Sequence, residues 1–168
     1  MKTGSPFDNP FAGKDPDRRD IWEMLVVRDC EGFLRKNWSM VDGDFIREAF
    51  EGIVAHESAD PDRWTLAYPT LESYRDDWLK EAEEFLHMQL AAGTHRDLIY
   101  GLTHLRYIEI NQGRALAHKQ FQADAELRGG GHYRLYCQTL YRLHRVEGRW
   151  KIVGFVGYLP LHFGGAGG

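Results

Sequence analysis

In the first half of the chain, apolar residues recur every three or four positions. This spacing is typical of amphipathic helices, and it predicts one within Ile21 to Trp38 and another from Thr70 to Gly93. The first stretch follows Asp15-Pro16-Asp17, which offers an N-cap and a proline at the first helical position. A shorter helix is expected between residues 39 and 50.

In the second half the period changes to two, which is typical of β-strands. From residue 97 onward, turn residues at 111–113, 129–131 and 147–148 divide the sequence into four long strands, and two short strands are expected at 53–56 and 64–68. We therefore expect an α+β fold: a curved antiparallel sheet, shaped like a half-barrel or cone, with about three helices packed on its concave face. Gly101, Gly154 and Gly157 should let the sheet bend. An apolar cavity with a few polar groups should remain between helices and sheet.

Asp29 interrupts the apolar face of the first predicted helix. A period of 3.6 residues places its carboxylate on the same side as Trp22, Val26 and Phe33. An unpaired buried charge is very costly, so Asp29 should be bonded to a backbone amide or an arginine, or else face a pocket where it binds a ligand or does chemistry. The pattern leaves both roles open.

Composition and charge narrow the range of functions. A net charge of -4 and a pI near 6.0 argue against a surface for nucleic acid or for anionic membranes. No apolar run has the length of a transmembrane helix and the first residues do not have the order of a signal peptide, so a cytoplasmic protein is expected. Cys30 and Cys137 are expected to be reduced core thiols. The histidines lack metal-ligand spacing, and neither a metal nor a cofactor is expected.

The length of 168 residues is that of one domain. Residues 1–14 are rich in glycine and proline and are expected to form an irregular arm, which Phe7 and Phe11 attach to the body of the protein or to a second subunit. Residues 15–162 form the predicted α+β domain. The glycine-rich residues 163–168 are expected to be a flexible tail.

Three segments resemble the nuclear-transport-factor-2-like superfamily and, within it, the SnoaL-like (polyketide cyclase-like) branch. They are FLRKNWSMVDGDF at Phe33 to Phe45, PTLESYRDDW at Pro69 to Trp78, and EGRWKIV at Glu147 to Val153. The resemblance covers about residues 18–160, and it implies the α+β cone and a homodimer formed through one face of the sheet. Ketosteroid isomerase, scytalone dehydratase, polyketide cyclases and limonene epoxide hydrolase belong to this superfamily, alongside members without catalysis.

The sequence does not match the catalytic set of ketosteroid isomerase. By the resemblance, Asp29 stands where that enzyme has an oxyanion-hole tyrosine, and Thr139 stands near its protonated aspartate. The general-base aspartate would correspond to a position among His56, Glu57 and Ser58. Steroid isomerisation is therefore not expected. Tyrosines and histidines around a pocket are more similar to the hydratase and dehydratase relatives.

The predicted catalytic residues are Asp29, His56, Thr139 and Tyr141. A carboxylate orients an imidazole and stabilises its protonated form, so an Asp29–His56 pair could abstract a proton or activate water near neutral pH. Thr139 and Tyr141 share one face of a predicted strand with Cys137, and the resemblance turns this face towards the cavity. There the two hydroxyls could hydrogen-bond a developing oxyanion. The alternative is a set of satisfied polar residues around an empty or water-filled cavity.

Further side chains are predicted to line the ligand pocket. They are Trp22, Val26, Phe33, Tyr74, Trp78, His104, His118 and Cys137. His104 and His118 lie on strands whose two faces are both mixed, so the pattern does not decide which face lines the pocket. A face that carries His118 and glutamines would suit a dimer interface equally well.

The sequence thus predicts a pocket protein whose ligand is a small apolar or aromatic molecule. One hypothesis is a cofactor-independent enzyme that performs acid–base chemistry, namely dehydration, cyclisation, isomerisation or hydration, with Asp29 and His56 as the acid–base pair. The other is a non-catalytic ligand-binding module, or a dimeric assembly module, of the same fold.

Overall fold

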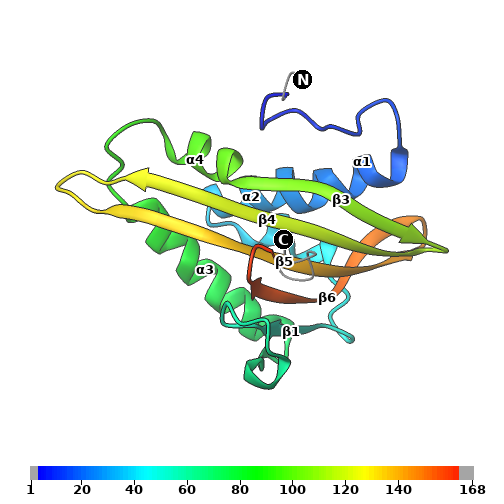
Figure 1. Ribbon diagram of the computed structural model, residues 1–168. Helices are drawn as coiled ribbons and strands as arrows, with labels where there is room; N and C mark the ends of the chain where they lie inside the picture. The colour runs from blue at the N-terminus through cyan, green and yellow to red at the C-terminus, as the bar shows by residue number, and fades with distance from the viewer. Residues whose placement is uncertain (1–3, 163–168) are drawn as a thin grey trace.

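The computed structural model describes residues 4–162, which form the expected α+β fold: helices on one face of a curved, unclosed sheet (Figure 1). The helices are α1 (Pro16–Trp22), α2 (Asp29–Leu34), α3 (Leu71–His87) and α4 (His95–Leu102). The strands are β1 (Glu51–Val54), β2 (Thr65–Tyr68), β3 (Thr103–Asn111), β4 (Arg114–Glu126), β5 (His132–Val146) and β6 (Arg149–Leu159). Residues 163–168, the predicted tail, lie outside the described part.

The sheet has the strand order β2-β1-β6-β5-β4-β3. Strands β3 to β6 form the predicted antiparallel meander. Strand β1, however, pairs with β6 in parallel, with Ile53 opposite Val156. The sheet is therefore mixed, which differs from the antiparallel sheet that the sequence predicts. The register between β5 and β6 shifts beside Gly154 and again beside Gly157. Such bulges bend a strand, and they fall at two of the three glycines where bending was predicted; the third, Gly101, lies in α4.

The first helix is continuous from Pro16 to Leu34 but contains a π-helical segment, η1 (Glu23–Arg28). It begins as predicted, because the Asp15 side chain accepts a hydrogen bond from the Arg18 amide at 3.1 Å. A π-helical turn holds more residues than an α-helical turn, so side chains beyond it point away from where a 3.6-residue count places them. Asp29 and Phe33 follow the segment and reach the cavity, whereas Trp22, before it, and Val26, within it, are buried in the core on a different side.

Two predicted elements are wrong. Residues 95–102 form α4, although the pattern from residue 97 onward predicted a strand. The side chain of Thr94 accepts from the Asp97 amide at 3.0 Å, and this cap is the helical signal that the pattern concealed. The short helix expected between residues 39 and 50 is replaced by two 3₁₀ turns, η2 (Trp38–Met40) and η3 (Asp42–Asp44).

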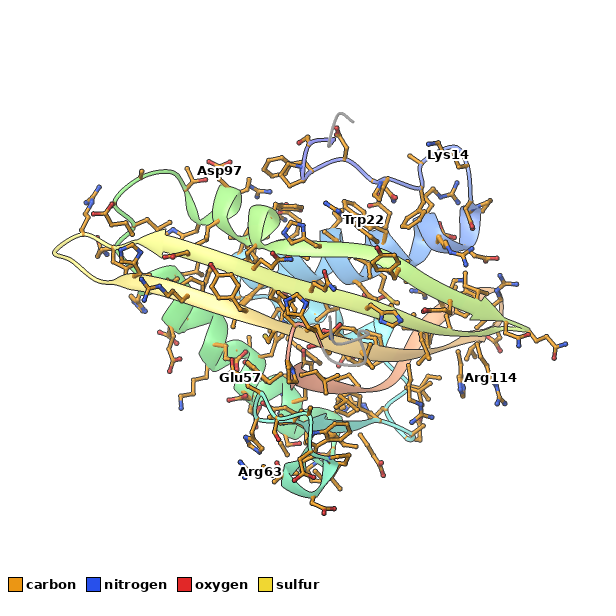
Figure 2. The ribbon with its side chains drawn as sticks, in the orientation of Figure 1. Lys14, Trp22, Glu57, Arg63, Asp97 and Arg114 are labelled. Carbon is orange, nitrogen blue, oxygen red and sulfur yellow. The ribbon has the colours of Figure 1, made fainter. Side chains whose placement is uncertain are left out.

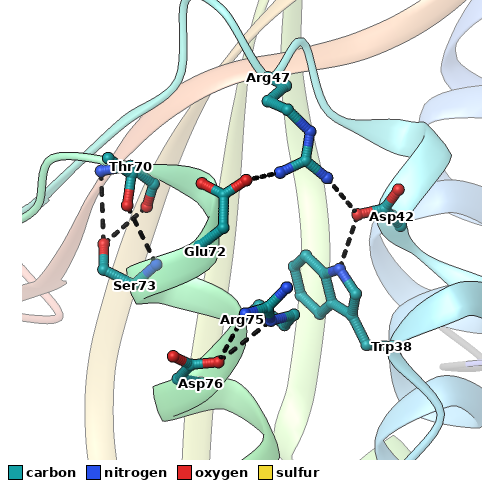
Figure 3. Close-up of polar contacts among 8 residues, drawn as sticks. All are labelled: Trp38, Asp42, Arg47, Thr70, Glu72, Ser73, Arg75 and Asp76. Carbon is teal, nitrogen blue, oxygen red and sulfur yellow. Dashed lines mark hydrogen bonds and ion pairs between the residues drawn. The ribbon is translucent and has the colours of Figure 1, made fainter.

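The N-terminus of α3 is fixed by polar contacts that Figure 3 shows. Thr70 and Ser73 form a capping box, in which the Thr70 hydroxyl accepts from the Ser73 amide at 3.2 Å. Arg47 bonds both Glu72 of α3 and Asp42, and so ties the helix to the loop before β1. These contacts set the start of the helix whose later turns line the cavity.

The arm packs on the helices over residues 4–14, along the upper edge of the view in Figure 2. The rings of Phe7 and Tyr100 lie 4.6 Å apart, Phe11 packs against the core, and Asn9 donates to Glu23 at 3.0 Å. Cys30 and Cys137 are buried, free thiols. Within the described residues, no helix is long and apolar enough to cross a membrane.

Candidate functional site

A cavity of about 500 Å³ lies between the helices and the concave face of the sheet. Its wall is mainly aromatic and aliphatic, with contributions from α2, α3, α4 and the strands β2 to β6. The polar and charged side chains in the wall, tyrosines aside, are Asp29, Glu81, Glu84, Thr103, Lys119 and Thr139. A mostly apolar cavity with a few polar groups is the usual form of a small-molecule site.

The strand period decides which side chains face the cavity. On β4, Lys119 and Phe121 point inward, and on β5, Cys137, Thr139 and Tyr141 do so. Lys119 is directly opposite Thr139 in the β4–β5 ladder. The charge of Lys119 and the hydroxyl of Thr139 are therefore neighbours on the floor of the cavity.

Asp29 and Lys119 form an ion pair at this floor. Lys119 Nζ lies 2.7 Å from Asp29 Oδ2, and the Trp78 indole donates to Asp29 Oδ1 at 3.1 Å. The Lys119 side chain is 1% exposed, whereas that of Asp29 is 30% exposed. The ammonium is thus fully enclosed, while part of the carboxylate remains open.

The π-helical segment provides a second hydrogen-bond partner for Lys119. In an α-helix the Asp29 amide would bond the Leu25 carbonyl, four residues earlier. Here the Asp29 amide bonds the Val26 carbonyl, and the Leu25 carbonyl accepts a hydrogen bond from Lys119 Nζ. The irregular helix therefore supplies both the carboxylate and the carbonyl that hold the buried ammonium.

The surroundings keep Lys119 charged and Tyr141 neutral. Burial disfavours the Lys119 ammonium, but the Asp29 carboxylate outweighs burial, and the pKa of Lys119 is raised above its ordinary value. The rings of Phe121 and Tyr141 face the ammonium at 5.5 and 5.9 Å. Burial raises the pKa of Tyr141 to about 12, so its hydroxyl remains a hydrogen-bond donor near neutral pH.

Three of the four predicted catalytic residues meet at the cavity, and His56 does not. Asp29, Thr139 and Tyr141 line it. His56 is exposed, lies in the loop after β1, and bonds the Thr65 hydroxyl at 2.9 Å. The predicted Asp29–His56 pair is therefore not formed: His56 bonds Thr65, and Asp29 bonds Trp78 and Lys119. Lys119 takes the place expected for the histidine.

The predicted pocket residues divide in the same way. Phe33, Tyr74, Trp78 and Cys137 line the cavity. Trp22 and Val26 belong to the core for the reason given above, and His104 is not part of the cavity wall. His118 points to the other face of β4, since its neighbour Lys119 points inward, and bonds Glu109 at 2.7 Å.

Sequence reasoning missed Lys119, and a signal for it was present. The inward side of β4 carries small or apolar residues at positions 115, 117, 121 and 123, and Lys119 interrupts it as Asp29 interrupts the helix. Two opposite charges that each interrupt an apolar face are a reason to expect an ion pair. Their long separation in sequence concealed the match.

A second polar group was also missed. Glu81 of α3 and Tyr158 of β6 both line the cavity, and the Tyr158 hydroxyl donates to Glu81 Oε1 at 3.1 Å. One turn earlier on α3, Asp77 accepts from the Tyr68 hydroxyl. Burial, with the Asp77 carboxylate in support, raises the pKa of Glu81 to about 7. Within residues 4–162, no group of three or more His, Cys, Asp or Glu side chains could hold a metal ion.

Comparisons with known proteins identify the fold. No family model matches the chain, and no curated protein does. An NTF2-like protein with a cystatin-like fold from Novosphingobium aromaticivorans aligns with a TM-score of 0.52 and 17% identity, over 90% of this chain and 85% of that one. An NTF2-like protein of unknown function from Shewanella oneidensis aligns at 0.51 and 11% identity, over 82% and 95%. This is the NTF2-like fold.

A further match is Aln2 from a Streptomyces species, with a TM-score of 0.53 and 11% identity over 83% of this chain and 87% of that one. At such identities the NTF2-like neighbours show a common fold only, because one fold carries many functions. The chemistry of this chain depends on the residues of its own cavity.

Proposed function

We propose that this chain is a SnoaL-like pocket protein that binds a small apolar or aromatic molecule and performs cofactor-independent acid–base chemistry on it. The observation that carries the proposal is the Asp29–Lys119 ion pair in the wall of an otherwise apolar cavity of about 500 Å³. A buried ion pair is often no more stabilising than apolar side chains of similar volume, so its presence favours a role beyond stability.

The geometry supports a division of roles. Asp29, oriented by Trp78 and Lys119, is the proton acceptor on its exposed side. Lys119 and the hydroxyls of Thr139 and Tyr141 surround the place where a ligand oxygen would gain negative charge. Proton removal next to such an oxygen is common to dehydration, cyclisation and isomerisation, and activation of water by the same carboxylate would give hydration.

The test is a panel of small aromatic and alicyclic alcohols, ketones and epoxides. Binding is followed by the fluorescence of Trp78 and the other tryptophans, and conversion by mass spectrometry. In Asp29→Asn we expect binding to persist and conversion to fall by about 10² or more. Asp76→Asn removes an exposed carboxylate of α3 and is the matched control, expected to convert as the wild type does.

A non-catalytic ligand-binding module is the second candidate. It is favoured by the fact that both oxygens of Asp29 already have partners, Trp78 and Lys119, which a purely structural carboxylate would also have. If wild type and Asp29→Asn bind the same ligands and neither converts any of them, the binding module is correct and the catalytic proposal is wrong.

We also propose that the protein forms a homodimer through the outer face of the sheet. Tyr107, Leu116 and Tyr136 are exposed large side chains on the face of the sheet that points away from the cavity. Exposed apolar groups on a sheet face support self-association through that face. Analytical ultracentrifugation should show a dimer that Leu116→Lys weakens; a wild-type monomer at high concentration would rule the dimer out.

A further inference from the structure

Glu81 forms a second polar centre in the cavity. It comes from α3 and meets Tyr158 of β6, whose hydroxyl donates to Glu81 Oε1 at 3.1 Å, and both side chains line the cavity. The charges that act most strongly on Glu81 are those of the carboxylates Asp77 and Glu84 on the same helix. In contrast to Asp29, which is matched by Lys119, Glu81 therefore lies in negative surroundings.

The backbone that presents Tyr158 is held in an unfavourable conformation. Tyr158, His56 and Glu57 have φ values of 54°, 54° and 59°, in the left-handed region that non-glycine residues rarely adopt. The three residues adjoin one another, because the Glu57 amide donates to the Tyr158 carbonyl at 2.7 Å. Strained residues of this kind often occur at functional sites. Here the strain lies where the Tyr158 hydroxyl reaches Glu81.

Glu81 can change its protonation state near neutral pH. Burial and the Asp77 carboxylate raise its pKa to about 7, and the hydrogen bond from Tyr158 opposes this rise. The titratable groups that act on Glu81 or respond to it come from α3, β2, β5 and β6: Asp77, Glu84, Tyr68, Tyr74, Tyr133, Cys137, Tyr141 and Tyr158. These tyrosines and the cysteine have raised pKa values and stay neutral near pH 7, so they do not compete with the carboxyl group of Glu81 for the proton.

We propose that Glu81 is a ligand-binding residue that hydrogen-bonds the hydroxyl or carbonyl oxygen of a neutral aromatic molecule in the cavity. Aromatic walls favour an aromatic ligand, and the carboxylates Asp77 and Glu84 disfavour an anionic one. A carboxyl group accepts from a hydroxyl when ionised and donates to a carbonyl when protonated. The inference rests on the proposed binding of a small molecule in the cavity, but it does not require catalysis by Asp29.

The first experiment uses three naphthalene probes of similar size. Naphthalene has no polar group, 2-naphthol has a hydroxyl, and 2-acetylnaphthalene has only a carbonyl acceptor. Relative to naphthalene, the affinity for 2-naphthol should rise by about tenfold between about pH 5.5 and 8.5, because hydrogen bonds to a charged group are stronger than neutral ones. The affinity for 2-acetylnaphthalene should fall over the same range, because an ionised carboxylate has no proton to donate to the carbonyl. Glu81→Gln should remove both pH dependences.

The second experiment measures Glu81 directly, with or without a ligand. In protein with carbon-13-labelled glutamate, one carboxyl signal should titrate near pH 7 and vanish in Glu81→Gln. Tyr158→Phe removes the hydrogen bond that lowers the pKa and should raise it, whereas Asp77→Asn should lower it. Glu83→Gln, an exposed neighbour that pairs with Lys36, is the matched control and should change neither titration nor binding.

The outcomes separate the two proposals. Binding of the probes without opposite pH dependences, or with the same dependences in Glu81→Gln, overturns the role of Glu81 and leaves the pocket function intact. The absence of saturable binding by any probe contradicts both the proposed pocket function and this ligand class. A glutamate titration in the ordinary range overturns the Glu81 inference alone.

Discussion

At the scale of single residues, the two members of the central ion pair are buried to different degrees. Lys119 is enclosed at 1% exposure, and Asp29 is 30% exposed. A charge that has lost its counter-charge is more costly where water cannot reach it. The charge of Lys119 therefore depends more strongly on Asp29 than the charge of Asp29 depends on Lys119.

The first prediction follows from this difference. Asp29→Asn leaves the enclosed ammonium without its counter-charge and should lower the free energy of unfolding by about 3 kcal/mol. Lys119→Met should cost about 1 kcal/mol or less, because the remaining carboxylate is still partly solvated. The double variant should regain part of the loss caused by Asp29→Asn. Urea unfolding of all four proteins measures this coupling, and strictly additive losses would contradict it.

The second prediction concerns His56, which the sequence placed in the catalytic pair and the structure places outside the cavity. His56→Asn keeps a side chain that tolerates a positive φ and removes the imidazole. Ligand affinity and any conversion should stay unchanged. Both are measured with the panel of small molecules used for Asp29→Asn. A clear loss of either would show that His56 takes part in the site.

At the scale of elements, the backbone irregularities place the functional groups. Lys119 bonds the Leu25 carbonyl of the π-helical segment, and a bulge in β6 lies next to Tyr158. The apolar stripe of α3 and the hairpins at 111–113 and 147–148 could be predicted from sequence, since each follows from a regular period or a turn signal. The π-helical turn, the helix α4 and the parallel β1–β6 pairing could not.

The reasons for these failures are physical. A count of 3.6 residues per turn assumes the regular helix that the π segment interrupts, so Trp22 and Val26 were placed in the pocket. The segment 95–102 contains Ile99 and Tyr100, which suit strands as well as helices. Only the N-cap at Thr94 indicates that the segment is a helix. Thr139 and Tyr141 were placed in the cavity correctly, because a period of two within a long strand leaves no such freedom.

The third prediction tests the close approach of β1 and β6. A Cβ atom at Gly154 would lie 2.5 Å from the Glu51 carbonyl oxygen, which is backbone and cannot turn aside. Gly154→Ala should therefore destabilise the protein by about 1–3 kcal/mol. At Gly157 the same atom would meet Phe155 and Thr139 at 3.4 Å, an ordinary contact, so Gly157→Ala should be nearly neutral. Thermal unfolding distinguishes them; equal shifts would refute the steric explanation.

At the scale of the whole molecule, the Glu81 carboxyl couples stability to pH. Its pKa is raised in the folded protein from the ordinary 4.5 to about 7, so the folded state binds the proton more tightly than the unfolded chain does. The stabilisation from this group is fully present below about pH 4.5 and is lost as the pH rises through 7.

The fourth prediction is the size of this effect. Between about pH 4.5 and 7, the free energy of unfolding of the wild type should fall relative to that of Glu81→Gln by about 2 kcal/mol, a value reduced for the partial exposure of the side chain. The difference between the two proteins, measured by urea unfolding at several pH values, isolates Glu81 from the other carboxylates. Parallel curves would mean that Glu81 has an ordinary pKa.

The backbone bond between Lys119 and the Leu25 carbonyl has a consequence for selectivity. Because this bond does not involve Asp29, it should keep Lys119 in place when the carboxylate is neutralised, and at a pH where Lys119 keeps its proton the charge of the former ion pair changes from zero to positive. The Asp29→Asn protein should therefore accept carboxylates such as 2-naphthoate, which the wild type should exclude, provided that the ligand places its anionic group near Lys119 and its rings against Tyr74 and Phe155. A single oxygen-to-nitrogen exchange would convert a pocket for neutral molecules into an anion receptor, and calorimetry with naphthoate against 2-acetylnaphthalene would reveal the reversal.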